Sequence, residues 1–209
     1  MPNQPLTVMV SSSVYGNQEL LEHIYTLFTA FDYRVWMSHK GTLPLAVPGS
    51  AFDACLQAVE DCDLFFGLIT PYYGSGRENR DALSITHQEI KKAIELDKPR
   101  WIMAHSHVVF ARSIINNLGL KSSARRPRFR PVRSRLTLKK NNVFEDLKII
   151  EMYEEAIQNH LPLAQRTRNW VQEYQTFQDV FRFIESQFSD QTRIRSFLES
   201  LNAMTGEES

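Results

Sequence analysis

One glutamate stands out among the residues of this chain that could do chemistry. In the stretch SITHQEIKKAIELDKP (84–99), apolar residues recur at the spacing of an amphipathic helix. At about 100° per residue, Glu89 falls inside the apolar arc, between Leu96 and Ala93. A carboxylate on the core side of a helix costs free energy unless it has polar partners or opens into a cavity. Glu89 is therefore the first candidate for a functional carboxylate.

Glu89 also fits a structural role at the start of the helix. Thr86 and Glu89 have the T-x-x-E spacing of a capping box, in which the glutamate accepts a hydrogen bond from the N-cap backbone N–H. Ser84 is an equally good N-cap, and it would put His87 rather than Glu89 at the box position. The spacing alone leaves both interpretations open.

Several hydroxyl groups could join such a site. Ser11, Ser12 and Ser13 form a run that offers hydroxyls and backbone N–H groups suited to a phosphate or a ribose, or else a solvated turn. Ser84 lies one turn before Glu89 and could contact a ribose, or serve only as a helix cap.

Aromatic side chains are the next candidates. Tyr15, Tyr72 and Tyr73 could stack on a base or a nicotinamide ring, and we expect one of them to pack against the neighbouring loop instead. His39, His105 and His107 are weaker candidates, because isolated histidines are more often surface residues.

Two further residue types suggest ordinary structural roles. Arg112 could meet a phosphate, but an ordinary surface ion pair is the simpler expectation. Cys55 and Cys62 form no CxxC pair, and histidines are not clustered at metal-ligand spacing, so we expect reduced core thiols and no metal site.

The elements that position these residues alternate along the chain. Strands are expected at 6–14, 33–40, 63–70 and 98–106, with an edge strand at 167–174. Helices are expected at 17–31, 51–62, 84–97, 108–120, 144–159, 176–188 and 192–204. This alternation predicts an α/β fold with a parallel sheet of four to five strands flanked by helices, in a TIR-like or flavodoxin-like three-layer arrangement with a C-terminal helical extension.

The fold class also predicts where a ligand would bind. In open parallel sheets, ligands lie outside the carboxyl ends of the strands, where helix N-termini point. The expected walls are 11–15, 38–50, 71–76, the start of the helix that carries Glu89, and 105–107.

The second half of the chain is less regular. Residues 119–143 contain nine Lys or Arg, two prolines and no acid, which predicts a loop or a mobile insertion. We therefore expect an α/β core at 1–118, a basic insertion at 119–143, and helices with the edge strand at 144–209 that complete the same domain.

Composition narrows the class of protein. The 209 residues carry 24 Lys or Arg and 24 Asp or Glu, so net charge does not point to nucleic acid or to a membrane surface. The apolar runs are too short to span a bilayer, and the first residues lack the features of a secretory signal, so we expect a cytoplasmic protein.

Three segments together resemble a known group of proteins. These are VMVSSSVYG, PGSAFDACLQAVEDCDLFFGLITPYYGSG and SITHQEIKKAIELDKPRWIM. Over about residues 6–112 they resemble an uncharacterised bacterial domain family that often precedes a STAND-type NTPase, within the wider TIR-like and nucleoside deoxyribosyltransferase-like group. The helix HQEIKKAIELDKP looks like the segment in which NAD-cleaving TIR domains and deoxyribosyltransferases carry their essential glutamate, which would make Glu89 the catalytic residue.

The resemblance implies an NAD-cleaving or nucleotide N-glycosidase effector, or a signal-producing enzyme, of bacterial anti-phage immunity. Cleavage of an N-glycosidic bond builds oxocarbenium character on the ribose, and a nearby carboxylate can stabilise that charge, hold the ribose hydroxyls or trap the sugar. NAD would be the substrate, and no cofactor or metal is needed. The resemblance also implies self-assembly, since TIR-like enzymes often act only when assembled. No NTPase motif follows in the chain, so we expect any STAND-type effector or sensor partner to be a separate protein or absent.

Two other functions stay open. TIR-like domains also serve as non-catalytic modules that sense a nucleotide or assemble with partners, so the fold alone does not decide. The basic segment 119–143 could instead contact nucleic acid by electrostatic tethering, since Phe129 is its only aromatic residue.

Overall fold

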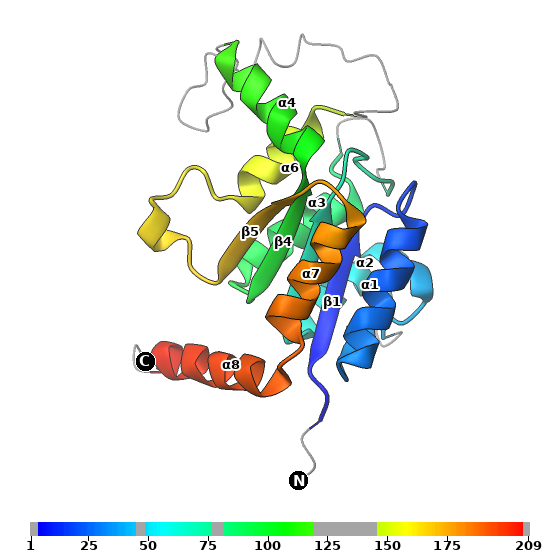
Figure 1. Cartoon of the computed structure of the whole chain (residues 1–209), viewed down its shortest axis with the longest axis vertical. Coiled ribbons are helices and arrows are strands. Elements are labelled where there is room, and N and C mark those ends of the chain that lie inside the picture. Colours follow the sequence, from blue (N-terminus) through cyan, green and yellow to red (C-terminus); the bar gives the residue numbers. More distant parts are fainter. Residues whose placement is uncertain (1–3, 45–48, 77–81, 119–145, 207–209) are drawn as a thin grey trace.

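Five strands form one parallel sheet, as the alternation predicts. In the computed structural model of the chain, the described residues are 4–44, 49–76, 82–118 and 146–206. The strands are β1 (Thr7–Ser12), β2 (Arg34–Trp36), β3 (Leu64–Ile69), β4 (Arg100–His105) and β5 (Asn169–Tyr174). Their order in the sheet is β2-β1-β3-β4-β5, and every neighbouring pair is parallel (Figure 1).

The helices also fall where the sequence places them. They are α1 (Gln18–Ala30), α2 (Ala51–Asp61), α3 (Ile85–Glu95), α4 (Ser106–Asn117), α6 (Lys148–Ala156), α7 (Phe177–Phe188) and α8 (Gln191–Gly206), with short 3-10 turns at Ser38–Lys40 and Leu163–Gln165. The predicted α/β class, parallel sheet and C-terminal helices are confirmed. The predicted basic insertion at 119–143 lies outside the described residues.

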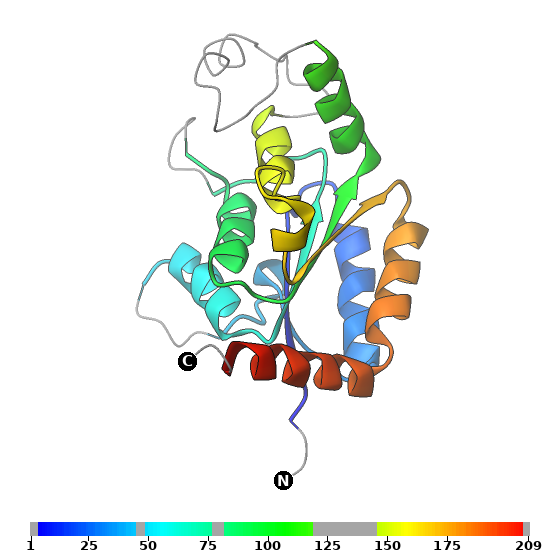
Figure 2. The same ribbon diagram turned by 90° about the vertical axis from the view of Figure 1, so that its left-hand side faces the viewer.

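The sheet separates two apolar layers. On one face, α1 and α7 pack around Phe28, Phe66 and Phe188 (Figure 2). On the other face, α2, α3 and α6 pack around a second cluster that includes Ile90 and Ile150. All six residues of β3 are buried, because β3 is the middle strand and helices cover both of its faces.

The C-terminal part of the chain completes this sheet. β5 pairs with β4 along its whole length, from Asn169 opposite Arg100 to Tyr174 opposite His105. Its residues are mostly half-buried or exposed, as expected for an edge strand. Helix α6 packs against both α3 and α4, so residues after 146 contribute to the layer that carries Glu89.

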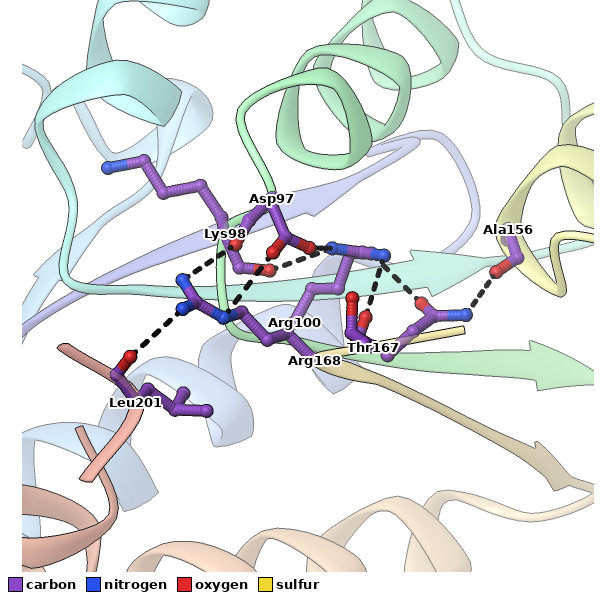
Figure 3. A network of polar contacts seen from close by, with 8 residues as sticks. Asp97, Lys98, Arg100, Ala156, Thr167, Arg168 and Leu201 are labelled. Carbon is purple, nitrogen blue, oxygen red and sulfur yellow. Dashed lines mark hydrogen bonds and ion pairs between the residues drawn. The ribbon is translucent and has the colours of Figure 1, made fainter. Parts of the chain in front are cut away.

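A buried arginine ties the edge strand to the rest of the sheet at its amino-terminal end (Figure 3). The Arg100 side chain is fully buried, donates to Asn169 Oδ1 at 3.0 Å and to the carbonyls of Lys98 and Thr167, and pairs with Asp97 at 3.4 Å. Asp97 also pairs with Arg168, whose guanidinium donates to the Leu201 carbonyl in α8. Asn169 in turn donates to the Ala156 carbonyl at the end of α6. One network therefore links β4, β5, α6 and α8.

Candidate functional site

Glu89 lies on the second turn of α3 and faces the sheet. Its side chain is only 3% exposed. The hydroxyl of Ser11, the fifth residue of β1, donates a hydrogen bond of 2.5 Å to Glu89 Oε2. The thiol of Cys55 on α2 also donates to this carboxylate. Glu89 is thus held at the carboxyl-terminal part of β1 by polar groups from a strand and a second helix.

The structure decides between the two predicted helix starts. Ser84 is the N-cap of α3, and its Oγ accepts a hydrogen bond from the His87 backbone N–H at 3.4 Å. Thr86 lies inside the helix, so the proposed capping box of Thr86 and Glu89 is wrong. Glu89 sits beyond the first turn, where its carboxylate does not cap the helix.

Burial changes the acidity of this carboxyl group. Removal from water raises the pKa of Glu89 from 4.5 to about 7, and the hydrogen bonds from Ser11 and Cys55 offset part of that rise. Burial and the neighbouring Glu89 carboxylate together raise the pKa of the Cys55 thiol to about 12. Glu89 therefore exchanges a proton near neutral pH, whereas Cys55 stays a thiol, which is the form that donates.

The serine run at the end of β1 is mostly engaged within the protein. Ser11 is committed to Glu89, and the buried Ser13 hydroxyl lies 2.7 Å from Thr70 Oγ1 just after β3. Ser12 is half-buried, and its hydroxyl donates to the Ser13 carbonyl at 3.1 Å. The expected contacts of these serines with a nucleotide stay a prediction, and the shown role of Ser11 is to hold Glu89. Ser84 is fully buried and serves as a cap, the simpler of its two expected roles.

The three tyrosines differ in their accessibility. Tyr15 is 74% exposed and packs edge-on against Tyr72, with ring centroids 5.6 Å apart. Tyr73 is fully buried in the core cluster beneath α3, so the expected stacking of its ring on a ligand does not fit this structure. The Tyr72 ring packs against Gly16, which has a φ of +74°. A Cβ added at Gly16 would lie 2.9 Å from that ring, so the close approach requires glycine.

Two buried polar groups near Glu89 were missed by sequence analysis. His87 is only 1% exposed, because α6 packs against that side of α3. Its Nδ1 lies 2.8 Å from the Tyr73 hydroxyl and its Nε2 lies 3.1 Å from Glu155 Oε2. Cys55 was expected to be a plain core thiol, and no sequence spacing links it to Glu89.

The weaker candidates have ordinary roles. His105 is the N-cap of α4, and its Nδ1 accepts from the His107 backbone N–H at 3.1 Å. Arg112 pairs with Glu154 at 3.4 Å, but this ion pair is not at the surface as expected, since the two side chains are only 21% and 9% exposed. His39 is half-buried in the 3-10 turn after β2.

Two surface hollows lie away from Glu89. One, of about 820 Å³, lies between the start of β2 and α8 and includes Tyr33, Arg34 and Arg195. The other, of about 430 Å³, lies beside the start of α4 and includes His107, Phe110 and Glu173. Glu89 lines neither hollow, and its carboxylate is enclosed by the protein. Within the described ranges, no group of three or more His, Cys, Asp or Glu side chains could hold a metal ion, and no helix is long and apolar enough to cross a membrane.

The fold and site together define a parallel α/β protein with a buried carboxylate at the carboxyl-terminal side of its sheet. The chain belongs to the family described as "Domain of unknown function (DUF4062)", which matches residues 7–180. Among solved structures, it is similar to a conserved protein from Enterococcus faecalis V583, at 11% identity over 88% of this chain and 99% of that one, with a TM-score of 0.41. A search of curated proteins found no match.

Proposed function

We propose that this protein cleaves the N-glycosidic bond of NAD or a related nucleotide, with Glu89 as the catalytic carboxylate. The observation that carries the proposal is the buried Glu89 carboxylate, held by Ser11 beside the carboxyl end of β1. Ligands of parallel sheets bind at this edge. The resemblance of the α3 segment to the glutamate-bearing helix of NAD-cleaving TIR domains supports the same residue.

The chemistry needs one carboxylate near the ribose. When the bond between C1′ and the nicotinamide nitrogen breaks, the electron pair leaves with nicotinamide and positive charge develops on the ribose. The ionised Glu89 stabilises that charge, and water then adds to C1′ and releases a proton. In this proposal a ribose hydroxyl replaces the hydrogen bond that Ser11 donates to Oε2. A pKa of about 7 gives Glu89 both protonation states near neutral pH.

The biological setting follows from the same resemblance. An enzyme of this kind would act in the cytoplasm as an effector or signal producer in bacterial anti-phage immunity. Self-assembly or a separate sensor protein would control it, so activity should rise with protein concentration.

Nicotinamide release from NAD tests the proposal. The parent protein is incubated with NAD over a range of protein concentrations beside Glu89→Gln, and Glu95→Gln serves as the control, because Glu95 is exposed on the same helix. We expect release from the parent and the control and a loss of at least about 100-fold in Glu89→Gln. Release that survives Glu89→Gln would refute the assignment.

One observation favours a second function. Glu89 is 3% exposed and already has two hydrogen-bond donors, as expected for a buried polar group that only stabilises the fold. The protein would then be a non-catalytic module that senses a nucleotide or assembles with partners. Saturable NAD binding without nicotinamide release at any protein concentration, unchanged in Glu89→Gln, would support this function over catalysis.

A further inference from the structure

A buried histidine joins three segments beside the candidate site. The His87 side chain is only 1% exposed, yet both of its ring nitrogens have partners. Tyr73, in the loop after β3, reaches Nδ1, and Glu155 of α6 reaches Nε2. The Tyr73 and His87 rings meet edge-on, with centroids 5.8 Å apart.

The chain of hydrogen bonds runs from the surface to the interior. Glu155 is 44% exposed, whereas Tyr73 is fully buried. Partial burial opposes ionisation of Glu155, but the hydrogen bond from His87 and the charges of His87, Lys91 and His160 outweigh it, so the pKa of Glu155 lies below its usual range. Glu155 is thus ionised at neutral pH and accepts from the imidazole.

The same helix turn carries Glu89. His87 and Glu89 are two residues apart on α3 and point in different directions, so His87 meets Tyr73 and α6 while Glu89 meets β1 and α2. Figure 2 shows α6 beside α3, in agreement with the contacts between the two helices. The first two turns of α3 are thereby fixed from both sides.

We propose that His87 is a positioning residue for Glu89, and that Glu155 and Tyr73 act through it to fix the first turns of α3 against the sheet. A helix in the C-terminal part of the chain thus controls the geometry of a carboxylate in the N-terminal part. The catalytic consequence rests on the proposed function, whereas the mechanical consequence does not.

Two substitutions each remove one end of the hydrogen-bonded series Tyr73–His87–Glu155 and leave His87 unchanged. Glu155→Gln removes the charge of a half-exposed group at constant size, and Tyr73→Phe removes only the hydroxyl. The matched control is Glu151→Gln, one turn earlier on α6, where Glu151 is exposed. Thermal unfolding of each variant establishes that it is folded.

Hydrogen exchange tests the mechanical part without any substrate. We expect amide exchange in residues 84–92 to rise at least about fivefold in Glu155→Gln and Tyr73→Phe and to stay at the parent rate in Glu151→Gln. Equal exchange in all four proteins would overturn the inference, whatever their activity.

Kinetics test the catalytic part. Glu155→Gln should lower kcat for nicotinamide release roughly tenfold with KM within about twofold, because a displaced catalytic group affects the reacting geometry more than binding. In Glu155→Gln, water should also reach Glu89 and lower its pKa, which would move the pH profile of kcat to lower pH. A loss of global stability would not cause this shift. An unshifted profile with unchanged kcat contradicts the inference, whereas a parent protein that releases no nicotinamide contradicts only the proposed function.

Discussion

At the scale of single residues, the environment of Glu89 sets its chemistry. Ser11 and Cys55 are uncharged donors, and among the described residues no cation contributes to the shift in the pKa of Glu89. The hydrogen bonds from these two residues therefore stabilise the ionised form against the cost of burial. This balance keeps the carboxyl group close to its point of titration at neutral pH.

The pH dependence of stability should reveal this group. The pKa of Glu89 is raised to about 7 in the folded protein, so between pH 4.5 and 7 the folded state binds more protons than the unfolded state, and stability falls as pH rises. Between pH 5 and pH 8 the loss in unfolding free energy amounts to about 2.5 kcal/mol. Urea unfolding at pH 5 and pH 8 should show this loss in the parent and in Glu95→Gln, and not in Glu89→Gln. If the unfolding free energies of the parent and Glu89→Gln changed equally with pH, the raised pKa of Glu89 would be contradicted.

Ser11→Ala should act on the same equilibrium with a predictable sign. The Ser11 hydroxyl stabilises the ionised carboxylate, so its removal raises the pKa of Glu89 further. We expect a loss of about 1–2 kcal/mol at pH 8 and a smaller loss at pH 5, measured by urea unfolding. Ser12→Ala is the control, since the Ser12 hydroxyl bonds, among the described residues, to the neighbouring Ser13 carbonyl and not to Glu89. An equal loss at both pH values would show that Ser11 does not stabilise the charge.

The site was predicted from the sequence only in part. The helical period placed Glu89 on the inner arc correctly, since that placement depends on local spacing. The burial of His87 could not be predicted, because its cover comes from Glu155, 68 residues later. The burial of Tyr73 could not be predicted either, because the spacing does not indicate which of the three tyrosines turns inward to meet His87.

At the scale of elements, the edge strand β5 depends on one buried arginine. Arg100 donates to Asn169 and to the Thr167 carbonyl, while Asn169 reaches the Ala156 carbonyl on α6. β4 and β5 also stack Trp101 on Trp170, with ring centroids 4.8 Å apart. Polar and aromatic contacts thus fix an edge strand whose side chains are mostly half-buried or exposed.

Arg100→Lys should weaken this attachment although it keeps the charge. A lysine cannot reproduce the fork of donors, so buried acceptors of Thr167 and Asn169 lose their partners. We expect a loss of about 2–4 kcal/mol in unfolding free energy by urea titration. Arg182→Lys, at an exposed position on α7, should change stability by less than about 0.5 kcal/mol. Similar values for both variants would mean that the network contributes little.

The elements themselves were largely predictable. The continuous apolar run of β3 indicated a strand covered on both faces, and the alternation with helices indicated parallel pairing. β2 was predicted at eight residues but spans three, because a 3-10 turn at Ser38–Lys40 begins two residues after its end. The Arg100 network was not predicted, since it joins residues of four elements that only the fold brings together.

At the scale of the whole molecule, the charge balance conceals a strongly basic segment. Residues 119–143 carry nine Lys or Arg and no acid, in a chain with zero net charge. Nucleic-acid contact through this segment stays a prediction, which concerns residues outside the described ranges.

Deletion of residues 121–140 tests that prediction. If the segment tethers nucleic acid, DNA binding by the parent should fall steeply between 50 and 200 mM salt, by about a thousandfold or more for six or more phosphate contacts. The deletion variant should bind weakly at every salt concentration, as measured by fluorescence anisotropy. Binding that is independent of salt, or equal in both proteins, would exclude the tethering role.

The central claim, that Glu89 is the reactive carboxylate of a nucleotide site, is tested most directly by carboxyl-carbon NMR. Protein labelled with ¹³C at the glutamate carboxyls is titrated with pH in the absence and presence of NAD, and Glu89→Gln assigns the resonance. We predict one glutamate that titrates near pH 7, is missing from Glu89→Gln, and shifts its midpoint when NAD is added. A Glu89 resonance that titrates near pH 4.5, or one that NAD leaves unchanged at saturating concentration, would contradict the claim.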